Sequence, residues 1–359
     1  MRNETRLLFN GFVSQIALIN GVPDATAQFT VAPAVQQKIV ERVQLQSEFL
    51  RSINYIMVPE QEGQTVGIDI TQPIAGRTNT AGNNRIQPAD PTDTSEVNTY
   101  RCERTEFNWA RQYSAIDAWR HRPEFETLLR DAILKRQALD MILMGWNGTS
   151  VAASSNRTTN PLLQDLAKGW LYKIRTKAPL RYLKDGALTG SGADKIYVAG
   201  GVELYNEVTN NVATAKADFV NLDALVYDAI ELLDEWHRDS TDLVVICGRD
   251  LVHDKYFPMI NNAGDKATEQ EARDRILRSE KQIGGLPAIR VPFFPANALL
   301  ITSLDNLSVY EQENSRRRRL ADEPEYTRIA NYDMANIDFV VEDYGKVALV
   351  ENIVLAAKP

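Results

Sequence analysis

The residues best suited to chemistry in this sequence are three histidines and two cysteines. His121, His237 and His253 lie far apart in the chain, and none has the spacing of a metal-ligand motif. A surface or capping role is therefore the favoured interpretation of each histidine. Cys102 and Cys247 are also distant from each other, which argues against a disulfide framework and favours a reducing cytoplasm.

No pattern for catalysis or cofactor binding stands out. The string ICGRD at residues 246–250 superficially matches a nucleotide-binding turn. It lacks both the Gly-x-Gly-x-x-Gly pattern and a Lys-Ser/Thr pair after the glycine. No Gly-x-Ser-x-Gly elbow for a nucleophilic serine is present. We therefore expect a protein that is not an enzyme and has no cofactor and no metal site.

Four successive arginines form the strongest charge run: Arg316, Arg317, Arg318 and Arg319. They could contact DNA phosphates, but five acidic residues flank them: Glu311, Glu313, Asp322, Glu323 and Glu325. Alternating blocks of opposite sign favour ion pairs, within or between subunits, over phosphate binding.

Length and composition limit the class of protein. A chain of 359 residues, 44% hydrophobic and 25% charged, can bury a large core and divides more naturally into two or more units than into one. The formal net charge of −8 argues against a surface coated in nucleic-acid-binding charge, but it is compatible with a protein that surrounds DNA. No run of 18 apolar residues suggests a membrane span, and the first residues do not resemble a secretory signal.

The longest predicted element is a helix over Pro123–Asn147. Apolar residues recur there at spacings of three and four, Pro123 suits a first turn, and Gly148 is a plausible stop. About 25 residues would form a rod of about 37 Å, long for a globular helix. The first half is amphipathic, whereas Leu139–Trp146 leaves little polar face and should be buried.

The N-terminal region predicts two helices. The first, residues 4–19, would have one apolar side formed by Leu8, Phe12, Ile16 and Ile19. It is either docked on the core or detachable, because the polar stretch Gly21–Gln28 would be an accessible tether. The second helix follows Pro33 and ends before Pro59.

Residues 63–116 predict two strands around a long polar excursion. Thr65–Ile70 alternates apolar and polar side chains, and Tyr100–Ile116 has an extended, aromatic-rich pattern. Residues 71–98 between them are rich in Thr, Asn, Gly, Pro and Asp, and so long a polar loop is usually functional or disordered. We expect a projecting hairpin that lies on a neighbouring subunit, since it cannot bury enough surface alone.

The second half of the chain predicts an α/β unit after a boundary near Lys184–Asp194. A helix should begin at Pro161, and the expected elements after the boundary are helices at 222–238, 249–260 and 268–282 and a strand at 242–247. The charged stretch SRRRRLADEPE should be a link to closing strands in IDFVVEDY and VALVENIVL.

Longer strings, in order along almost the whole chain, carry a resemblance to a known family. They include MRNETR at the start, KRQALD and GWNG in the long helix, SSNRTTNPLLQDLAKGWL after it, and DLVVICGRDLVHDKYFP and IGGLPAIRVPFFPANALLITSLDNLSVY further on. With these strings the sequence resembles the major capsid proteins of tailed bacteriophages, specifically the peduovirus-type branch of contractile-tailed phages.

The resemblance implies an α+β chain with the Hong Kong-type capsid fold. The implied divisions are an N-terminal prosegment (1–29), an N-terminal arm (30–62), an E-loop hairpin (63–112), a peripheral domain (113–185) with the spine helix 123–147, an axial α/β domain (186–322) and a return to the peripheral domain (323–359).

The implied function is self-assembly into an icosahedral virion shell of pentamers and hexamers that encloses double-stranded DNA without sequence-specific binding. Assembly would take place in the host bacterial cytoplasm through a procapsid. The expected partners are further copies of the chain, an internal scaffold with maturation protease activity, a portal protein and a decoration protein, with no membrane involved.

The resemblance also implies particular sites. Proteolysis of the prosegment would fall near Phe29–Thr30. The hairpin residues Arg77 and Arg85, together with the arginine run at 316–319, are candidates for contacts between subunits. Some capsids of this fold form a lysine–asparagine isopeptide bond from the E-loop, but residues 59–104 contain no lysine. We therefore predict no cross-link from this loop, because the reaction needs an amine nucleophile.

Two alternative functions remain open from the sequence. An encapsulin-like compartment protein would share the fold and hold a protein cargo, although the prosegment-like N-terminus favours the phage interpretation. A two-domain α/β enzyme is the remote alternative, and it lacks a recognisable catalytic constellation.

Overall fold

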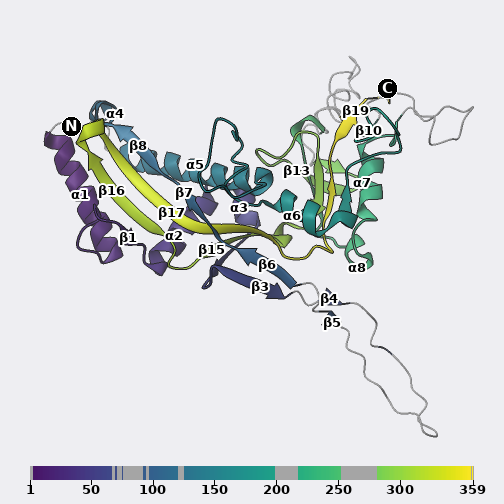
Figure 1. The fold of residues 1–359 in the computed structure, drawn as a ribbon, viewed down its shortest axis with the longest axis horizontal. Coiled ribbons are helices and arrows are strands. Elements are labelled where there is room, and N and C mark those ends of the chain that lie inside the picture. The colour runs from purple at the N-terminus through teal and green to yellow at the C-terminus, as the bar shows by residue number, and fades with distance from the viewer. Residues whose placement is uncertain are drawn as a thin grey trace, which may run out of the picture.

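The computed structural model describes residues 3–66, 69–70, 75, 92–93, 97–119, 125–198, 217–251, 281–356 and 358. The chain is α+β, with two large sheets side by side along an elongated body (Figure 1). Arg77, Arg85, His121, His253 and most of the helices expected at 249–260 and 268–282 lie outside the described residues.

The larger sheet is built on one long strand, β17 (Arg328–Val341). The strand order is β1 (Phe29–Thr30), β16 (Arg317–Glu323), β17, β15 (Leu307–Gln312) and β2 (Asn54–Val58). Two further strands, β7 (Glu103–Glu106) and β8 (Trp109–Gln112), also pair with β17. β17 confirms the closing strand expected in IDFVVEDY. Strands β15 and β16 both pair with β17. Residues 307–322, expected in the axial domain with residues 186–306, therefore belong to this larger sheet.

The charged stretch SRRRRLADEPE was predicted to be a link, and this prediction is wrong, because the stretch contains strand β16. A short 3-10 turn (Pro324–Tyr326) and Thr327, whose φ of 52° is left-handed, return the chain into β17 as a hairpin. Leu320 and Ala321 are buried, whereas Arg317 and Arg319 are exposed. Charged side chains suit a strand near the rim of a sheet, so their density hid the strand from the sequence pattern.

The smaller sheet has the order β12 (Gln282–Ile283), β13 (Leu286–Ile289), β11 (Val244–Cys247), β14 (Leu299–Thr302), β18 (Ala348–Val350), β9 (Tyr182–Leu183). Nearby, β10 (Ile196–Val198) runs parallel to β19 (Ile353–Leu355). β11 and β18 confirm the strands expected in DLVVIC and VALVENIVL. The helix expected at 222–238 is divided into α7 (Leu222–Ile230) and α8 (Glu235–Arg238). Asn221 caps α7 by accepting the Ala224 amide at 2.8 Å.

The predicted long helix is confirmed as α5 (Phe125–Asn147). Met141–Met144 and Trp146 are buried as expected, but Leu139 is only half-buried. Burial also extends to Gln137 and Ala138, before the predicted buried half. The second half of α5 packs on α6 (Trp170–Lys177). A Cβ added at Gly145 would lie 2.3 Å from the Trp170 ring, so glycine permits this close packing. The helix predicted to begin at Pro161 begins at Trp170 instead, because residues 161–169 are not helical.

Four short or N-terminal helices complete the described body: α1 (Asn3–Asn20), α2 (Pro33–Leu45), α3 (Glu48–Ser52) and α4 (Tyr113–Trp119). α1 confirms the first predicted helix, although Ile19 is exposed rather than on the packed side. The second predicted helix is divided between α2 and α3. Tyr113–Ile116, expected to be extended, is helical in α4.

The described part of the predicted hairpin confirms paired strands that leave the body. β3 (Glu62–Val66) pairs antiparallel with β6 (Val97–Arg101), and β4 (Asp69–Ile70) pairs with β5 (Thr92–Asp93) further out (Figure 1). Residues 103–112, expected within the hairpin region, instead supply strands to the larger sheet. No helix in the described part of the chain combines the length and apolarity that crossing a bilayer requires.

Candidate functional site

The predicted cleavage residues Phe29 and Thr30 form strand β1 at the edge of the larger sheet. Phe29 lies opposite Arg318 and Thr30 opposite Arg317. Phe29 is buried, whereas the Thr30 side chain is exposed. The candidate cleavage bond is therefore part of a β-ladder, and it is not in a free tether.

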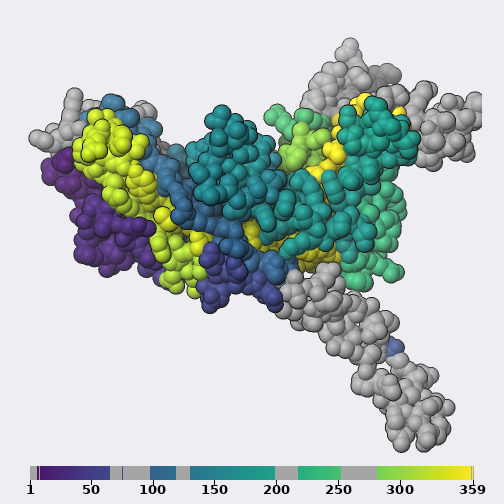
Figure 2. All heavy atoms as spheres, in the orientation of Figure 1, coloured from purple at the N-terminus to yellow at the C-terminus, as the bar shows by residue number. Residues whose placement is uncertain are grey.

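The N-terminal helix covers an apolar surface beside this edge. The buried members of that cluster are Ile16, Ala17, Ala25, Phe29, Val31, Leu320 and Ile329, and Tyr113 and Ile116 of α4 pack against them. The N-terminal residues lie directly against the β16 region of the sheet in Figure 2. Of the two open interpretations of α1, the structure has it docked on the core.

Asp322 joins three elements next to this cluster. It accepts a hydrogen bond from the Arg6 guanidinium at 3.2 Å and another from the hydroxyl of Tyr113. Burial, followed by the hydrogen bond to Asp322, raises the pKa of Tyr113 to about 12, so the phenol remains a donor at neutral pH. The contact links α1 and α4 to the end of β16.

Arg316, the first of the predicted arginines, points into the protein and is 3% exposed. Its guanidinium donates to both Asp333 oxygens, at 3.1 and 2.8 Å, and lies 3.7 Å from Glu311. Glu311 also accepts from Gln36 at 2.7 Å and from the hydroxyl of Tyr55. Burial would lower the pKa of Arg316, but the neighbouring carboxylates raise it above its ordinary value.

Burial and the adjacent carboxylate also raise the pKa of Tyr55 well above its ordinary value. The phenol therefore stays protonated and donates to Glu311. The buried charge of Arg316 is thus paired with carboxylates of its own chain. The structure shows this intrachain contact and not the contact between subunits that was expected for Arg316.

The other three arginines lie along β16 with different surroundings. Arg318 donates to the Asn331 side chain at 2.8 Å, and burial lowers the pKa of its guanidinium. Arg319 donates to the Thr26 carbonyl at 3.1 Å. Arg317 is exposed beside β1. Thus Arg317 and Arg319 present charge at the surface next to the N-terminal segment.

A second polar cluster lies at the base of the hairpin, and no sequence pattern indicated it. The Lys173 ammonium on α6 lies 2.8 Å from both oxygens of Asp338 on β17, and Asp338 also accepts the Arg101 amide at 3.0 Å. Buried Asn98 on β6 donates to the Val341 carbonyl at 2.8 Å and accepts from Lys177. These contacts attach β6 to the body, and no local spacing in the sequence could have brought the three segments together.

Cys102 and Cys247 are both free and buried, in different apolar clusters. Burial, the largest influence in both cases, raises the pKa of Cys102 to about 12 and that of Cys247 to about 11. Neither thiol is therefore activated as a nucleophile.

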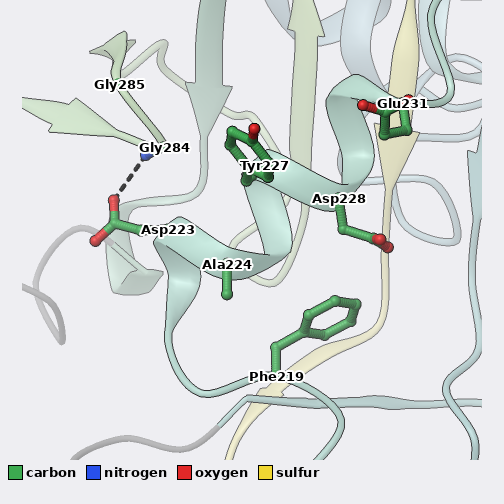
Figure 3. A pocket seen from close by; sticks show the side chains of 8 residues that line it. All are labelled: Phe219, Asp223, Ala224, Tyr227, Asp228, Glu231, Gly284 and Gly285. Atoms are coloured by element: carbon green, nitrogen blue, oxygen red, sulfur yellow. Dashed lines mark hydrogen bonds between the residues drawn. The ribbon is translucent and has the colours of Figure 1, made fainter.

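A shallow open hollow lies over α7 (Figure 3). Its volume is about 610 Å³, and its lining consists of Phe219, Asp223, Ala224, Tyr227, Asp228, Glu231, Gly284 and Gly285. Asp223 accepts the Gly284 amide at 2.7 Å. Among the described residues, this lining consists of carboxylates, aromatic rings and small residues, and it includes no histidine, serine or cysteine.

The described histidine, His237, lies 3.0 Å from Asp343 through Nε2. Among the described residues, no group of three or more His, Cys, Asp or Glu side chains is placed to hold a metal ion.

Comparisons with known proteins agree over nearly the full length of the chain. A family model described as phage major capsid protein, P2 family, matches residues 8–353. The capsid protein of Escherichia phage P2 is 42% identical, with 98% of this chain and 95% of the relative covered. The major capsid protein of Serratia phage KSP20 is 39% identical, with coverage of 99% and 98%.

A solved structure shares the fold closely. A chain from the satellite phage P4 procapsid, determined with the size determination (Sid) protein, has a TM-score of 0.76 and 40% identity, covering 99% of this chain and 98% of its own length.

Proposed function

The chain belongs to the P2 family of phage major capsid proteins, and on that premise we propose that it builds its shell from pentamers and hexamers around double-stranded DNA. It is a structural subunit of the virion capsid with the tailed-phage capsid fold. The family membership favours a phage shell over an encapsulin-like compartment or a two-domain enzyme.

The single observation that best supports this assembly is the projecting hairpin. Strands β3 and β6, continued by β4 and β5, extend away from both sheets (Figure 1). A two-stranded ribbon is marginally stable alone in water, so a neighbouring subunit is the natural surface to cover it. Arg77 and Arg85 in the hairpin sequence, and the exposed Arg317 and Arg319 on β16, are the proposed ionic contacts. For buried Arg316 the intrachain network is the better assignment.

We propose the remaining divisions in the same way: prosegment 1–29, arm 30–62, E-loop 63–102 and axial domain 186–306. The peripheral domain then comprises 103–185 and 307–359, because residues 103–112 and 307–322 supply strands to the larger sheet. An internal scaffold with protease activity would remove the prosegment at Phe29–Thr30. A portal protein and a decoration protein are further proposed partners, with assembly in the host cytoplasm.

DNA would be enclosed without sequence-specific binding. The net charge of −8 supports this, because a container that gripped the phosphates tightly would impede packaging and release of the genome.

Electron microscopy of the chain expressed with and without its scaffold tests the assembly proposal. We expect closed icosahedral shells of uniform diameter with the scaffold, and aberrant or open particles without it. Unassembled subunits under both conditions would contradict the proposal. N-terminal sequencing of subunits from mature particles tests the cleavage: Thr30 is expected as the first residue, and an intact Met1 would exclude the cut.

A further inference from the structure

The proposed cleavage bond lies in a strand paired with β16, and the Phe29 side chain beside it is buried, so its accessibility to a protease depends on the fold. We propose that residues 25–31 act as a strand gate: the Phe29–Thr30 bond is cut only after this segment has separated from β16. This inference rests on the proposed processing at that bond and adds the control of its timing.

Backbone hydrogen bonds hold the strand gate along β16. Beyond the β1 pairing, the Val31 amide donates to the Arg316 carbonyl at 2.9 Å, and the Leu320 amide donates to the Ala25 carbonyl at 3.1 Å. Arg319 adds a side-chain bond to the Thr26 carbonyl at 3.1 Å. One edge of the segment is thus occupied on both sides of the Phe29–Thr30 bond.

Side chains and the preceding helix keep the strand gate closed. Ala25, Phe29 and Val31 are buried in the same apolar cluster as Ile16 and Ala17 of α1. Moving residues 25–31 off the sheet therefore exposes apolar surface as well as breaking hydrogen bonds. The closed state should be favoured as long as α1 stays docked.

Proteases bind their substrates as extended segments that pair with the enzyme through the peptide backbone. In the closed gate one edge of that backbone is already paired with β16, and the buried Phe29 side chain is not free to enter a specificity pocket. Cleavage must therefore go through the open state, and its rate follows the population of that state when opening and closing are fast. Any shell rearrangement that undocks α1 would then permit processing.

Chymotrypsin is a suitable probe, because it cuts after phenylalanine and needs no phage partner. The full-length chain is treated briefly, and intact-mass analysis follows the product that begins at Thr30. Ile16→Ala removes packing under α1, where Ile16 is 8% exposed, and Leu18→Ala on the same helix is the matched control at 82% exposed. Amide hydrogen exchange at residues 29 and 31, which face β16, reports gate opening in the same samples.

We expect Ile16→Ala to accelerate both the exchange of these amides and the cut after Phe29 by about tenfold or more, and by the same factor, because both report the open population. Leu18→Ala should change neither rate. Cuts elsewhere in the chain serve as the internal measure of global destabilisation and should be unaffected. A cut after Phe29 that is equally fast in all three proteins, or faster than amide exchange, would overturn the gate.

A lock provides the converse test. Thr30 and Arg317 face each other across the two strands, and both side chains are exposed. The double variant Thr30→Cys/Arg317→Cys should resist the cut when oxidised and regain it on reduction, whereas Thr30→Cys alone should be cut as the wild type is. Cleavage of the oxidised double variant at the wild-type rate would also contradict the proposal.

The two proposals fail separately. An intact Met1 in mature particles would remove the proposed processing while leaving the chymotrypsin and exchange results valid. Normal processing in particles together with a cut that ignores the state of the strand gate would remove the gate alone.

Discussion

At the residue scale, buried ion pairs connect segments that are distant in the chain. Lys173 and Asp338 lie on α6 and β17, and both are less than a tenth exposed. The backbone amides of Arg101 and Phe339 complete the coordination of the Asp338 carboxylate at 3.0 and 2.9 Å. Such a pair is costly to break on one side only, because the remaining charge stays buried without compensation.

Asp338→Ala should therefore lower the free energy of unfolding by about 3–5 kcal/mol, since it leaves the Lys173 ammonium buried without its carboxylate. The double variant Lys173→Met/Asp338→Leu should lose clearly less, because neither charge remains. Urea unfolding of the unassembled subunit, followed by circular dichroism, measures both. A double variant as unstable as the single one would contradict this account.

A second buried pair should make stability depend on pH. Lys358 lies 2.8 Å from Asp218, which also accepts the amides of Tyr197 and Ala187. Burial would raise the pKa of Asp218, but these donors outweigh it and hold the pKa below its ordinary 3.8. The folded pKa is lower than the unfolded one, so the stabilisation is fully present above 3.8 and is lost as pH falls through the folded value.

The wild type should accordingly lose more stability than Asp218→Asn when the pH is lowered from about 5 to about 2, because only the wild-type carboxylate has to take up a proton there. Urea midpoints measured for both proteins over this range provide the comparison. Parallel pH profiles would show that Asp218 is not stabilising as an anion.

At the element scale, the two halves of helix α5 have different surroundings. Its first part carries an exposed Arg136 that pairs with Asp140 one turn later, a surface pair of small energetic value. Its second part is buried among aromatic rings: Trp146 lies 4.8 Å from Trp170 between ring centroids and 5.0 Å from Phe294. The helix should therefore respond to substitution very differently at the two ends.

Ile142→Ala, at a fully buried position, should lower the free energy of unfolding by about 2–5 kcal/mol through lost burial and a residual cavity. Leu139→Ala should cost less, because Leu139 is half-buried. Arg136→Ala should leave the fold intact and act, if anywhere, on assembly. Thermal or urea unfolding of the three variants tests the order, and an unfolded Arg136→Ala subunit would show that the division of α5 is wrong.

At the scale of the whole molecule, two large sheets form the body, and the β3–β6 ribbon extends away from it (Figure 1). The hairpin sequence contains no lysine between residues 59 and 104. We therefore expect a shell built with this loop to be held by non-covalent contacts at the hairpin, because the loop supplies no amine for an isopeptide bond.

Mature particles boiled in denaturant should consequently give a single band of subunit size on a gel. A ladder of covalent multimers would contradict this prediction. Mass spectrometry of any higher band would then identify the lysine that had reacted, and so distinguish a link through the hairpin from one elsewhere.

The sequence by itself determined the elements with long, regular patterns. The repeat of apolar side chains gave α5 almost to the residue, and the apolar runs gave β11, β18 and part of β17. The same patterns failed where charge masked a strand, as in β16, and where a polar stretch without a core preceded α6. Long ordered strings also sufficed to indicate the capsid family, since they depend on residue identity rather than on folding.

Only the tertiary structure decided what the candidate sites are. Nothing local in the sequence shows that Phe29 and Thr30 pair with residues nearly 290 positions later, or that Arg316 points inward to Asp333 while Arg317 points outward. Successive side chains of a strand point to opposite faces of the sheet, and the strands that pair with it come from distant segments of the chain. The chemistry of each arginine, and the accessibility of the candidate cleavage bond, therefore depend on contacts that local spacing cannot encode.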